Sequence, residues 1–236
     1  MKKSEYSKII LTIQSNPIQP MQHVKKLVSL ARTNNLCLIP FGGGTSVTHS
    51  VWCPPKSQEP RPIVSVDMRK MNKILWVNRE VRSQRVKRAS HKLGYRREYE
   101  PLLTPSHLLR SAQDGLACIE AGIVGRDLVD GLEGGYGLTM GHEPDSIEFS
   151  TLGGWVATKA SGMKRNKYGN IEDIVSEVTL VGGGEGNPDL SQSIVGRVSC
   201  GMELKDTILG SEGNFGIITS AVVKVSPLPE VVLYDR

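Results

Sequence analysis

The first regular pattern of apolar residues lies in residues 21–33. Apolar side chains recur there at intervals of three and four, which predicts the buried face of an amphipathic helix: Met21, Val24, Leu27, Val28 and Ala31. Two asparagines follow and end the helix. The apolar run 36–40 predicts a short buried strand that leads directly into a glycine-rich loop. A helix, a strand and a glycine loop in this order are typical of an α/β or α+β lobe.

The rest of the chain alternates between patterned and unpatterned segments. Strands are predicted at 63–66, 73–77, 116–121, 174–181 and 217–225, where apolar and β-branched residues cluster. Helices are predicted through 127–132 and over 151–160, and turns at Gly134, Gly135, Gly137 and Gly141. Residues 79–115 and 182–206 show no sustained period, and an unpatterned stretch as long as 79–115 is unusual inside a compact domain.

Composition and charge narrow the classes of protein that fit. The chain has 236 residues, 39% of them hydrophobic, and no apolar run near the roughly 18 residues of a membrane span. Its net charge of +5 comes from one segment. Residues 79–97 hold eight basic residues and one acid, whereas the rest of the chain holds 21 basic and 23 acidic residues. A basic patch confined to one segment, with Tyr95 as its one aromatic residue, argues against nucleic-acid binding.

Cysteine and histidine usage argues against a disulfide framework and a metal site. No two cysteines have C-x-x-C spacing, and the histidines show no ligand spacing. We therefore expect a reducing compartment, buried thiols and no metal ion. The N-terminus has no apolar core typical of a secretory signal, and the C-terminus is not the Ser-Lys-Leu peroxisomal address. The residues concerned are Cys37, Cys53, Cys118 and Cys200, and His23, His49, His91, His107 and His142.

The glycine-rich segment 41–46 is the first of four candidate binding loops. Three successive glycines after a strand let the backbone turn sharply and approach a ligand closely. Consecutive N–H groups, with the hydroxyls of Thr45 and Ser46, are then able to bind a diphosphate. A tight surface turn without a ligand is the alternative. The segment has neither the lysine of a P-loop nor the spacing of the dinucleotide fingerprint.

The other three segments have the same glycine-and-hydroxyl character. In 141–154, Pro144 starts a rigid turn, and Ser150 or Thr151 caps a helix whose N-terminus attracts anions. Segment 158–170 includes Lys164 and Arg165, which either neutralise a phosphate or form a solvated turn. Segment 210–216 is a glycine turn before the last strand. None of the four supplies a nucleophile beside a base, so we assign no catalytic residue.

Taken together, the four segments resemble the FAD-binding domain of the alkylglycerone-phosphate (alkyldihydroxyacetonephosphate) synthases, within the vanillyl-alcohol-oxidase-like flavoproteins. The resemblance covers roughly residues 15–77, 116–181 and 207–230. It implies an α+β fold with two FAD-binding subdomains of the PCMH type, 15–115 and 116–230, without the substrate-cap domain and with 79–115 as an irregular insert. The matching stretches are PFGGGTSV at 40–47, MNKILWV at 71–77, GHEPDSIEFSTLGGWV at 141–156, KASGMK at 159–164, YGNIED at 168–173 and GSEG at 210–213.

The resemblance also implies that FAD binds between the subdomains. The implied reaction replaces the acyl group of acyl-dihydroxyacetone phosphate by a fatty alcohol in ether lipid biosynthesis, with the flavin holding the substrate carbon and no net redox. The implied setting is the peroxisome, with a peripheral membrane contact through regions outside this chain and a homodimer. The residues implied to contact FAD are Pro40, Phe41, Gly42, Gly43, Gly44, Thr45, Ser46, Asp145, Ser146, Ile147, Glu148, Phe149, Ser150, Thr151, Thr158, Lys159, Ala160, Ser161, Glu212, Gly213, Asn214, Phe215, Gly216, Ile217 and Ile218.

Several departures from the family pattern qualify these expectations. The family's cap and C-terminal regions, which supply its catalytic residues, have no counterpart here, so we expect the chain to bind FAD but to be inactive alone, and cytoplasmic if made as written. Residues 79–115 interrupt a connection that is short in the family and resemble translated non-coding sequence, and 182–206 do not match. Val124 stands where a helix-capping threonine is expected, a loss of about 1 kcal/mol. Two alternatives stay open: a non-catalytic relative that binds flavin or a partner subunit, and an FAD-dependent oxidoreductase of a 2-hydroxy acid or alcohol.

Overall fold

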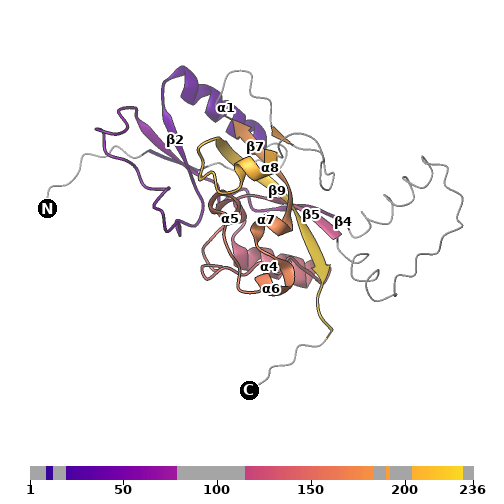
Figure 1. Ribbon diagram of the computed structural model, residues 1–236. Helices are drawn as coiled ribbons and strands as arrows, with labels where there is room; N and C mark the ends of the chain where they lie inside the picture. The colour runs from indigo at the N-terminus through magenta and orange to yellow at the C-terminus, as the bar shows by residue number, and fades with distance from the viewer. Residues whose placement is uncertain (1–8, 13–19, 79–114, 183–189, 192–203, 231–236) are drawn as a thin grey trace, which may run out of the picture.

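A parallel three-stranded sheet forms the N-terminal part of the structure (Figure 1). The computed structural model describes residues 9–12, 20–78, 115–182, 190–191 and 204–230. The sheet has β3 (Ile63–Asp67) at its centre, between β1 (Ile9–Thr12) and β2 (Cys37–Phe41). Helix α1 (Pro20–Thr33) lies between β1 and β2 in the chain, because strands that run in the same direction need a long crossover.

An antiparallel six-stranded sheet forms the rest of the framework. Its order is β4-β5-β9-β7-β8, with β6 paired to β9 outside this path. The long strand β9 is central and pairs with β5, β6 and β7, so it holds the sheet together. The strands are β4 (Ile74–Asn78), β5 (Gly115–Glu120), β6 (Leu138–Thr139), β7 (Val175–Gly182), β8 (Leu190–Ser191) and β9 (Gly216–Pro227).

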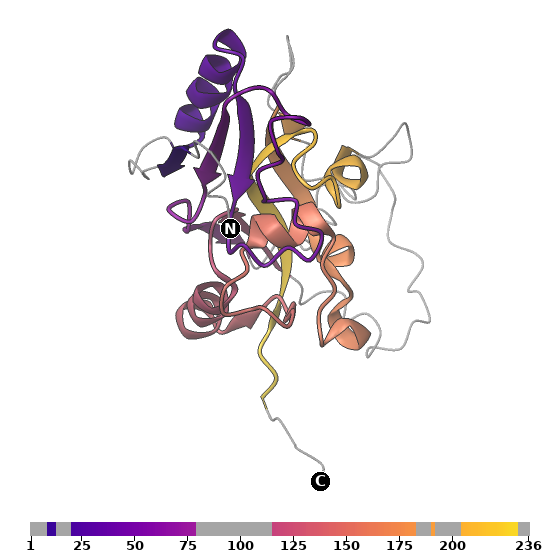
Figure 2. The same cartoon turned by 90° about the vertical axis from the view of Figure 1, so that its left-hand side faces the viewer.

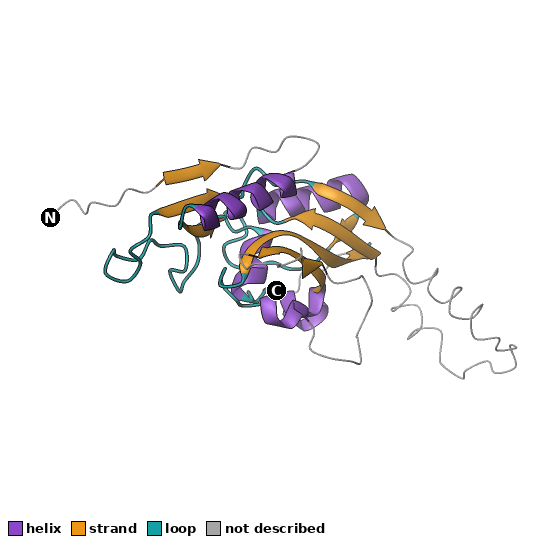
Figure 3. Cartoon of the chain, turned by 90° about the horizontal axis from the view of Figure 1, so that it is seen from above, coloured by secondary structure: helices purple, strands orange, loops and turns teal. Residues whose placement is uncertain are grey.

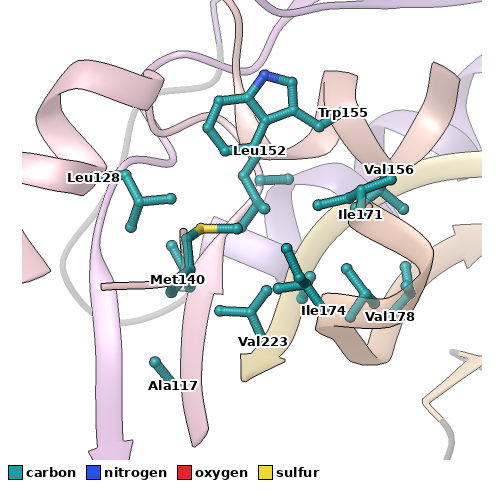
Figure 4. Close-up of a cluster of buried hydrophobic side chains, with 14 of the residues drawn as sticks. Ala117, Leu128, Met140, Leu152, Trp155, Val156, Ile171, Ile174, Val178 and Val223 are labelled. Atoms are coloured by element: carbon teal, nitrogen blue, oxygen red, sulfur yellow. The ribbon is translucent and has the colours of Figure 1, made fainter. Parts of the chain in front are cut away.

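Helices cover one face of the six-stranded sheet and enclose the larger core (Figures 3 and 4). Leu128 and Leu132 of α4 and Leu152 and Val156 of α5 are fully buried there against β5, β7 and β9. Figure 4 shows the middle of this core around Met140. The helices are α4 (Gly125–Tyr136), α5 (Leu152–Thr158), α6 (Arg165–Tyr168), α7 (Ile171–Ile174) and α8 (Leu204–Ile208).

A second core joins the two sheets. Val24 and Val28 of α1 pack with Val181 of β7 and Ile217 of β9, on the face of the large sheet opposite α4 and α5. Neighbouring residues of a strand point to opposite faces, so each of these strands contributes to both cores. Helix α1 therefore belongs to the small sheet by sequence and also covers part of the large one.

The predicted elements are largely confirmed, with differences where the pattern was short. The helix at 21–33, the strands and the helix after Ser150 are present, each within about two residues of the predicted bounds. The predicted turns at Gly134 and Gly135 are wrong, because α4 continues through both glycines and ends at Gly137. Helices α6 and α7 and strand β1 were not predicted, and Ile174 ends α7 instead of starting a strand.

Two predictions lie mostly outside the described residues, namely the insert 79–115 and the segment 182–206. The domain limits 15–230 also stay a prediction: β1 precedes residue 15, and β4 pairs with β5 in the large sheet. Within the described ranges, no helix combines the length and apolar character needed to cross a membrane.

Candidate functional site

The glycine loop after β2 packs directly against the turn that precedes α5 (Figure 2). A methyl group on Gly43 would overlap the backbone carbonyl of Phe149, and one on Gly42 would overlap the Thr151 hydroxyl. These contacts join the three-stranded sheet to the helical layer of the large sheet. The first two candidate loops therefore form one wall, and the absence of side chains at 42 and 43 is what allows it.

The glycine loop has backbone donors that nothing in the described part of the chain uses. Among the described residues, the N–H groups of Gly43, Gly44 and Thr45 donate no hydrogen bond. Gly44 has a φ of 74°, the left-handed conformation in which successive N–H groups turn toward one side. A concave run of unpaired N–H groups binds an anion such as a phosphate.

The second loop, 145–151, is held rigid by its own hydrogen bonds. Both the N–H and the hydroxyl of Ser150 donate to the Ser146 carbonyl, each at 2.8 Å. The indole Nε1 of Trp155 donates to Ser150 Oγ at 2.7 Å. Thr151 caps α5 by accepting the Gly154 N–H at 3.3 Å, as the sequence predicted for this position. The loop is thus fixed to the buried side of α5 before any ligand arrives.

The third and fourth loops meet at the C-terminal end of α5. Lys159 ends the helix with a φ of 52°, and the backbone of Gly210 lies next to its side chain. The N–H of Gly210 donates to the Val156 carbonyl at 3.0 Å, and the N–H of Glu212 donates to the Ala157 carbonyl at 2.9 Å. Carbonyls at a helix end lack partners within the helix, so the fourth loop satisfies them.

The fourth loop also approaches the first. A Cβ on Gly213 would lie 3.5 Å from Cγ of Pro40, which precedes the glycines. The four predicted segments therefore form a chain of contacts: the first touches the second and the fourth, and the fourth touches the third. Of the predicted side chains, Phe149 and Phe215 stay exposed, by 66% and 51%. Glu148 lies at the surface and pairs with Arg126 at 3.0 Å.

A cavity of about 480 Å³ lies beside the first and fourth loops. Leu38 and Pro40 line it from β2, and Phe215 and Ile217 line it from the turn and strand β9. Arg61 also lines the cavity and is paired with Glu59 at 2.6 Å. The cavity is within the size range of sites that bind small molecules, and its mixed apolar and polar lining fits an aromatic base with a sugar.

His142 is a buried residue of this region that the sequence reasoning missed. It is 1% exposed and packs edge-on against Trp155 with ring centroids 5.0 Å apart, and neither ring nitrogen has a hydrogen-bond partner among the residues that the structure describes. Burial lowers the pKa of His142 to about 4, so the ring is neutral at pH 7. Its position in the turn-rich segment 141–154 was the available signal, whereas its spacing from the other histidines indicated only that it is no metal ligand.

The remaining polar candidates do not form a reactive cluster. Lys164 and Arg165 are exposed, and Lys164 pairs with Glu143, as in a solvated turn. Within the described residues, Cys37, Cys53 and Cys118 form no disulfide, and each is half-buried, so the expectation of buried thiols is met only in part for these three. Burial raises the pKa of the Cys37 and Cys118 thiols. Among the residues with described positions, no His, Cys, Asp or Glu group could hold a metal ion.

Comparison with known proteins finds similarity to an FAD-binding family and to one group of synthases. Residues 106–187 match the family described as FAD binding domain. The chain is 40% identical over 212 residues to the alkyldihydroxyacetonephosphate synthase of Caenorhabditis elegans, a match that covers 88% of this chain and 28% of that protein. It is 38% identical over 213 residues to the enzyme of that name from Dictyostelium discoideum, covering 90% of this chain and 28% of that protein.

Structural comparison agrees with the sequence comparison. A solved structure of alkyldihydroxyacetonephosphate synthase superposes with a TM-score of 0.68 at 36% identity, over 94% of this chain and 32% of that chain. The chain therefore spans about 28% of the length of the curated relatives it matches over most of its residues. A D-lactate dehydrogenase of Anaerostipes hadrus is 37% identical, but over 49% of this chain. The predicted α+β FAD-binding fold is confirmed.

Proposed function

We propose, from the premise that this chain is the FAD-binding portion of an alkyldihydroxyacetonephosphate synthase-like protein, that its four contacting loops hold the cofactor. The supporting observation is the glycine loop, whose backbone packs on Phe149 and whose N–H groups at 43–45 have no partner in the described chain. The residues fit FAD because they supply an anion cradle next to a cavity of suitable size.

Each part of the cofactor has a matching part of the site. The N–H groups of Gly43, Gly44 and Thr45 would receive the diphosphate. The cavity lined by Pro40, Phe215 and Ile217 would hold the adenosine end. The isoalloxazine ring would then lie along the second and third loops, 145–151 and 158–161, which α5 connects. We propose the same role, contact with FAD, for all the residues predicted from the resemblance, from Pro40 through Ile218.

The activity of the whole protein is a further part of the proposal. When bound, FAD supplies the reactive ring nitrogen of its flavin. The chain's own residues bind the diphosphate, fix the orientation of the ring through the rigid second loop and exclude water from the buried side of α5. By similarity, the reaction exchanges the acyl group of acyl-dihydroxyacetone phosphate for a fatty alcohol in ether lipid synthesis. The peroxisome as its location and a homodimer as its assembly belong to the same proposal.

Flavin titration tests the binding part of the proposal. Purified chain is titrated with FAD, FMN and riboflavin while flavin fluorescence and visible absorption are recorded. We expect FAD to bind more tightly than FMN, because FMN lacks the adenosine that the cavity would hold, and riboflavin to bind most weakly. A well-folded chain that binds none of the three would overturn the proposal. Equal binding of FAD and FMN would refute the assignment of the cavity.

A second experiment separates the exchange reaction from redox chemistry. Similarity to oxidoreductases favours the alternative, with a D-lactate dehydrogenase matching about half of this chain and a mitochondrial D-lactate dehydrogenase of Saccharomyces cerevisiae matching 89% of it at 25% identity. FAD-loaded chain is mixed anaerobically with D-lactate, glycolate and fatty alcohols, and bleaching of the flavin absorption is followed. Under the proposal none of them bleaches the flavin. Rapid bleaching by a 2-hydroxy acid would support the oxidoreductase in its place.

A further inference from the structure

One side-chain contact joins the glycine loop to the turn before β9. Thr48 Oγ1 donates a hydrogen bond to Glu212 Oε2 at 2.9 Å, across 164 residues of sequence and between the two sheets. Thr48 lies two residues beyond the predicted loop, and its side chain is exposed, so no packed core holds it in this position. The bond crosses the region where the first and fourth loops approach each other at Pro40 and Gly213.

Glu212 is held in place by more than this bond. Its φ of 49° is uncommon for a residue with a side chain, and such a conformation persists where the surroundings determine it. Its N–H donates to the Ala157 carbonyl at the end of α5. Glu212 therefore connects the fourth loop to α5 through its backbone and to the first loop through its carboxylate.

A row of hydroxyls continues from this bond into the glycine loop. Ser46 Oγ lies 3.0 Å from Thr48 Oγ1 and 3.0 Å from Ser50 Oγ. An ionised carboxylate only accepts hydrogen bonds, so Thr48 uses its proton on Glu212. Thr48 then accepts from Ser46, and Ser46 accepts from Ser50. The carboxylate thus sets the direction of the row, and the Ser46 proton points to Thr48.

We propose that Thr48 and Glu212 are positioning residues for FAD. Their bond sets the separation of the glycine loop from the turn before β9, which are the two sides of the diphosphate and adenosine region. In the row of hydroxyls that continues from this bond, the Ser46 hydroxyl donates its proton to Thr48, so the proton does not face the ligand. The diphosphate then meets the N–H groups of 43–45 and the Thr45 hydroxyl, and Ser46 contributes no proton. This inference rests on the proposed FAD site and adds a residue, Thr48, that lies outside the predicted contacts.

The test is a double-mutant cycle read by FAD affinity. Thr48→Val keeps the shape of the side chain and removes its hydroxyl, Glu212→Ala removes the acceptor, and the double variant removes both partners of the bond. Thr48→Ser restores the hydroxyl. Thr33→Val is the matched control, because Thr33 is an exposed threonine whose hydroxyl bonds only Ser29 of its own helix among the described contacts. Thermal unfolding without FAD reports whether each variant is folded.

We expect Thr48→Val to raise the FAD dissociation constant about tenfold, mainly through faster release, with an unchanged unfolding temperature. Thr48→Ser and Thr33→Val should bind FAD with the wild-type dissociation constant. The dissociation constant of the double variant should not exceed the higher of the two single-variant values. Tighter FAD binding by Thr48→Val would overturn the inference, because it would mean that the Ser46 proton, once released, binds the cofactor. Unchanged FAD affinity of Thr48→Val, or effects of the two substitutions that simply add, would overturn it as well. Failure of the wild-type chain to bind FAD would instead overturn the proposed function.

Discussion

At the scale of single residues, the glycines of the first loop were visible in the sequence, but their neighbour was not. Three glycines predict a sharp turn and close approach to a ligand. The structure adds that Gly43 lies against the backbone of Phe149 and Ser150, more than a hundred positions away. Thr48 was missed because a hydroxyl–carboxylate contact between sheets leaves no local pattern. His142 lies in a segment that the sequence singled out, but nothing in that segment indicated that the imidazole is buried.

Gly43→Ala should damage both the fold and the site. The added methyl group meets a backbone carbonyl that cannot move independently of its turn, so we expect a loss of about 1–3 kcal/mol in the free energy of unfolding. FAD binding should weaken as well, because the two walls separate. Urea unfolding and FAD titration measure the two effects.

Gly134→Ala provides the control for that variant. Gly134 is exposed in α4, and beyond its own helix no atom of the described residues lies within 4 Å of an added Cβ, so alanine should stabilise the chain by about 0.5–1 kcal/mol through helix propensity. Destabilisation by Gly134→Ala, or a neutral Gly43→Ala, would contradict the packing described for the two glycines.

His142 predicts a particular dependence of stability on pH. Its pKa is about 4 in the fold and about 6.5 when unfolded, so the unfolded chain binds the additional proton between these values. Stability from this group therefore rises with pH from about 4 to 6.5, by at most about 1.4 kcal/mol per pH unit, and is fully present above 6.5.

The His142 contribution is measured as a difference between two proteins. Burial raises the pKa of Glu120 and Glu177, so these carboxyls act in the opposite direction, and stability from them falls as pH rises. Unfolding free energies of wild type and His142→Leu are compared at several pH values between 4 and 7. We expect the stability of wild type relative to His142→Leu to increase with pH over this range, because only wild type carries the histidine that resists protonation in the fold.

At the scale of elements, the length of each helix determined how well the sequence predicted it. Helix α1 has five apolar residues in register and was predicted almost to its ends. Helices α6 and α7 have four residues each, which is too short for a period to show. Helix α4 was predicted too short, because glycines usually mark turns, whereas here Gly134 and Gly135 are exposed on a helix whose other face is anchored by Leu128 and Leu132.

The uncapped start of α4 offers a stabilising substitution. Val124 has the extended backbone of an N-cap residue but no side-chain acceptor, as the sequence suggested. Val124→Thr keeps the branched shape, adds an oxygen for the N–H groups of the first turn, and places Asp127 at the third helical position. We expect about 1 kcal/mol of added stability in urea unfolding. Val124→Ala, which adds no acceptor, should not stabilise the chain.

At the scale of the whole molecule, the two lobes are coupled through buried side chains of α1. The sequence predicted both lobes and, by resemblance, a cofactor between them, but not how they are joined. Val24 and Val28 touch Val181 and Ile217 of the large sheet, and β4, which follows directly after the small sheet in the chain, pairs with β5. Contacts of this kind depend on the relative placement of elements, and no short window of sequence specifies it.

Because β4 pairs with β5, the junction between these two strands is a suitable place to exchange or insert a segment of sequence. Asn78 lies opposite Leu116, so the backbone leaves the large sheet and re-enters it at neighbouring points. Replacing 79–114 by a four-residue glycine-containing turn should preserve both strands, because a short turn is long enough to join two paired antiparallel strands. Urea unfolding and FAD titration of the shortened chain would check this. A loss of flavin binding would mean that the excised stretch supplies contacts of its own; retention would make the junction a place to insert a reporter domain.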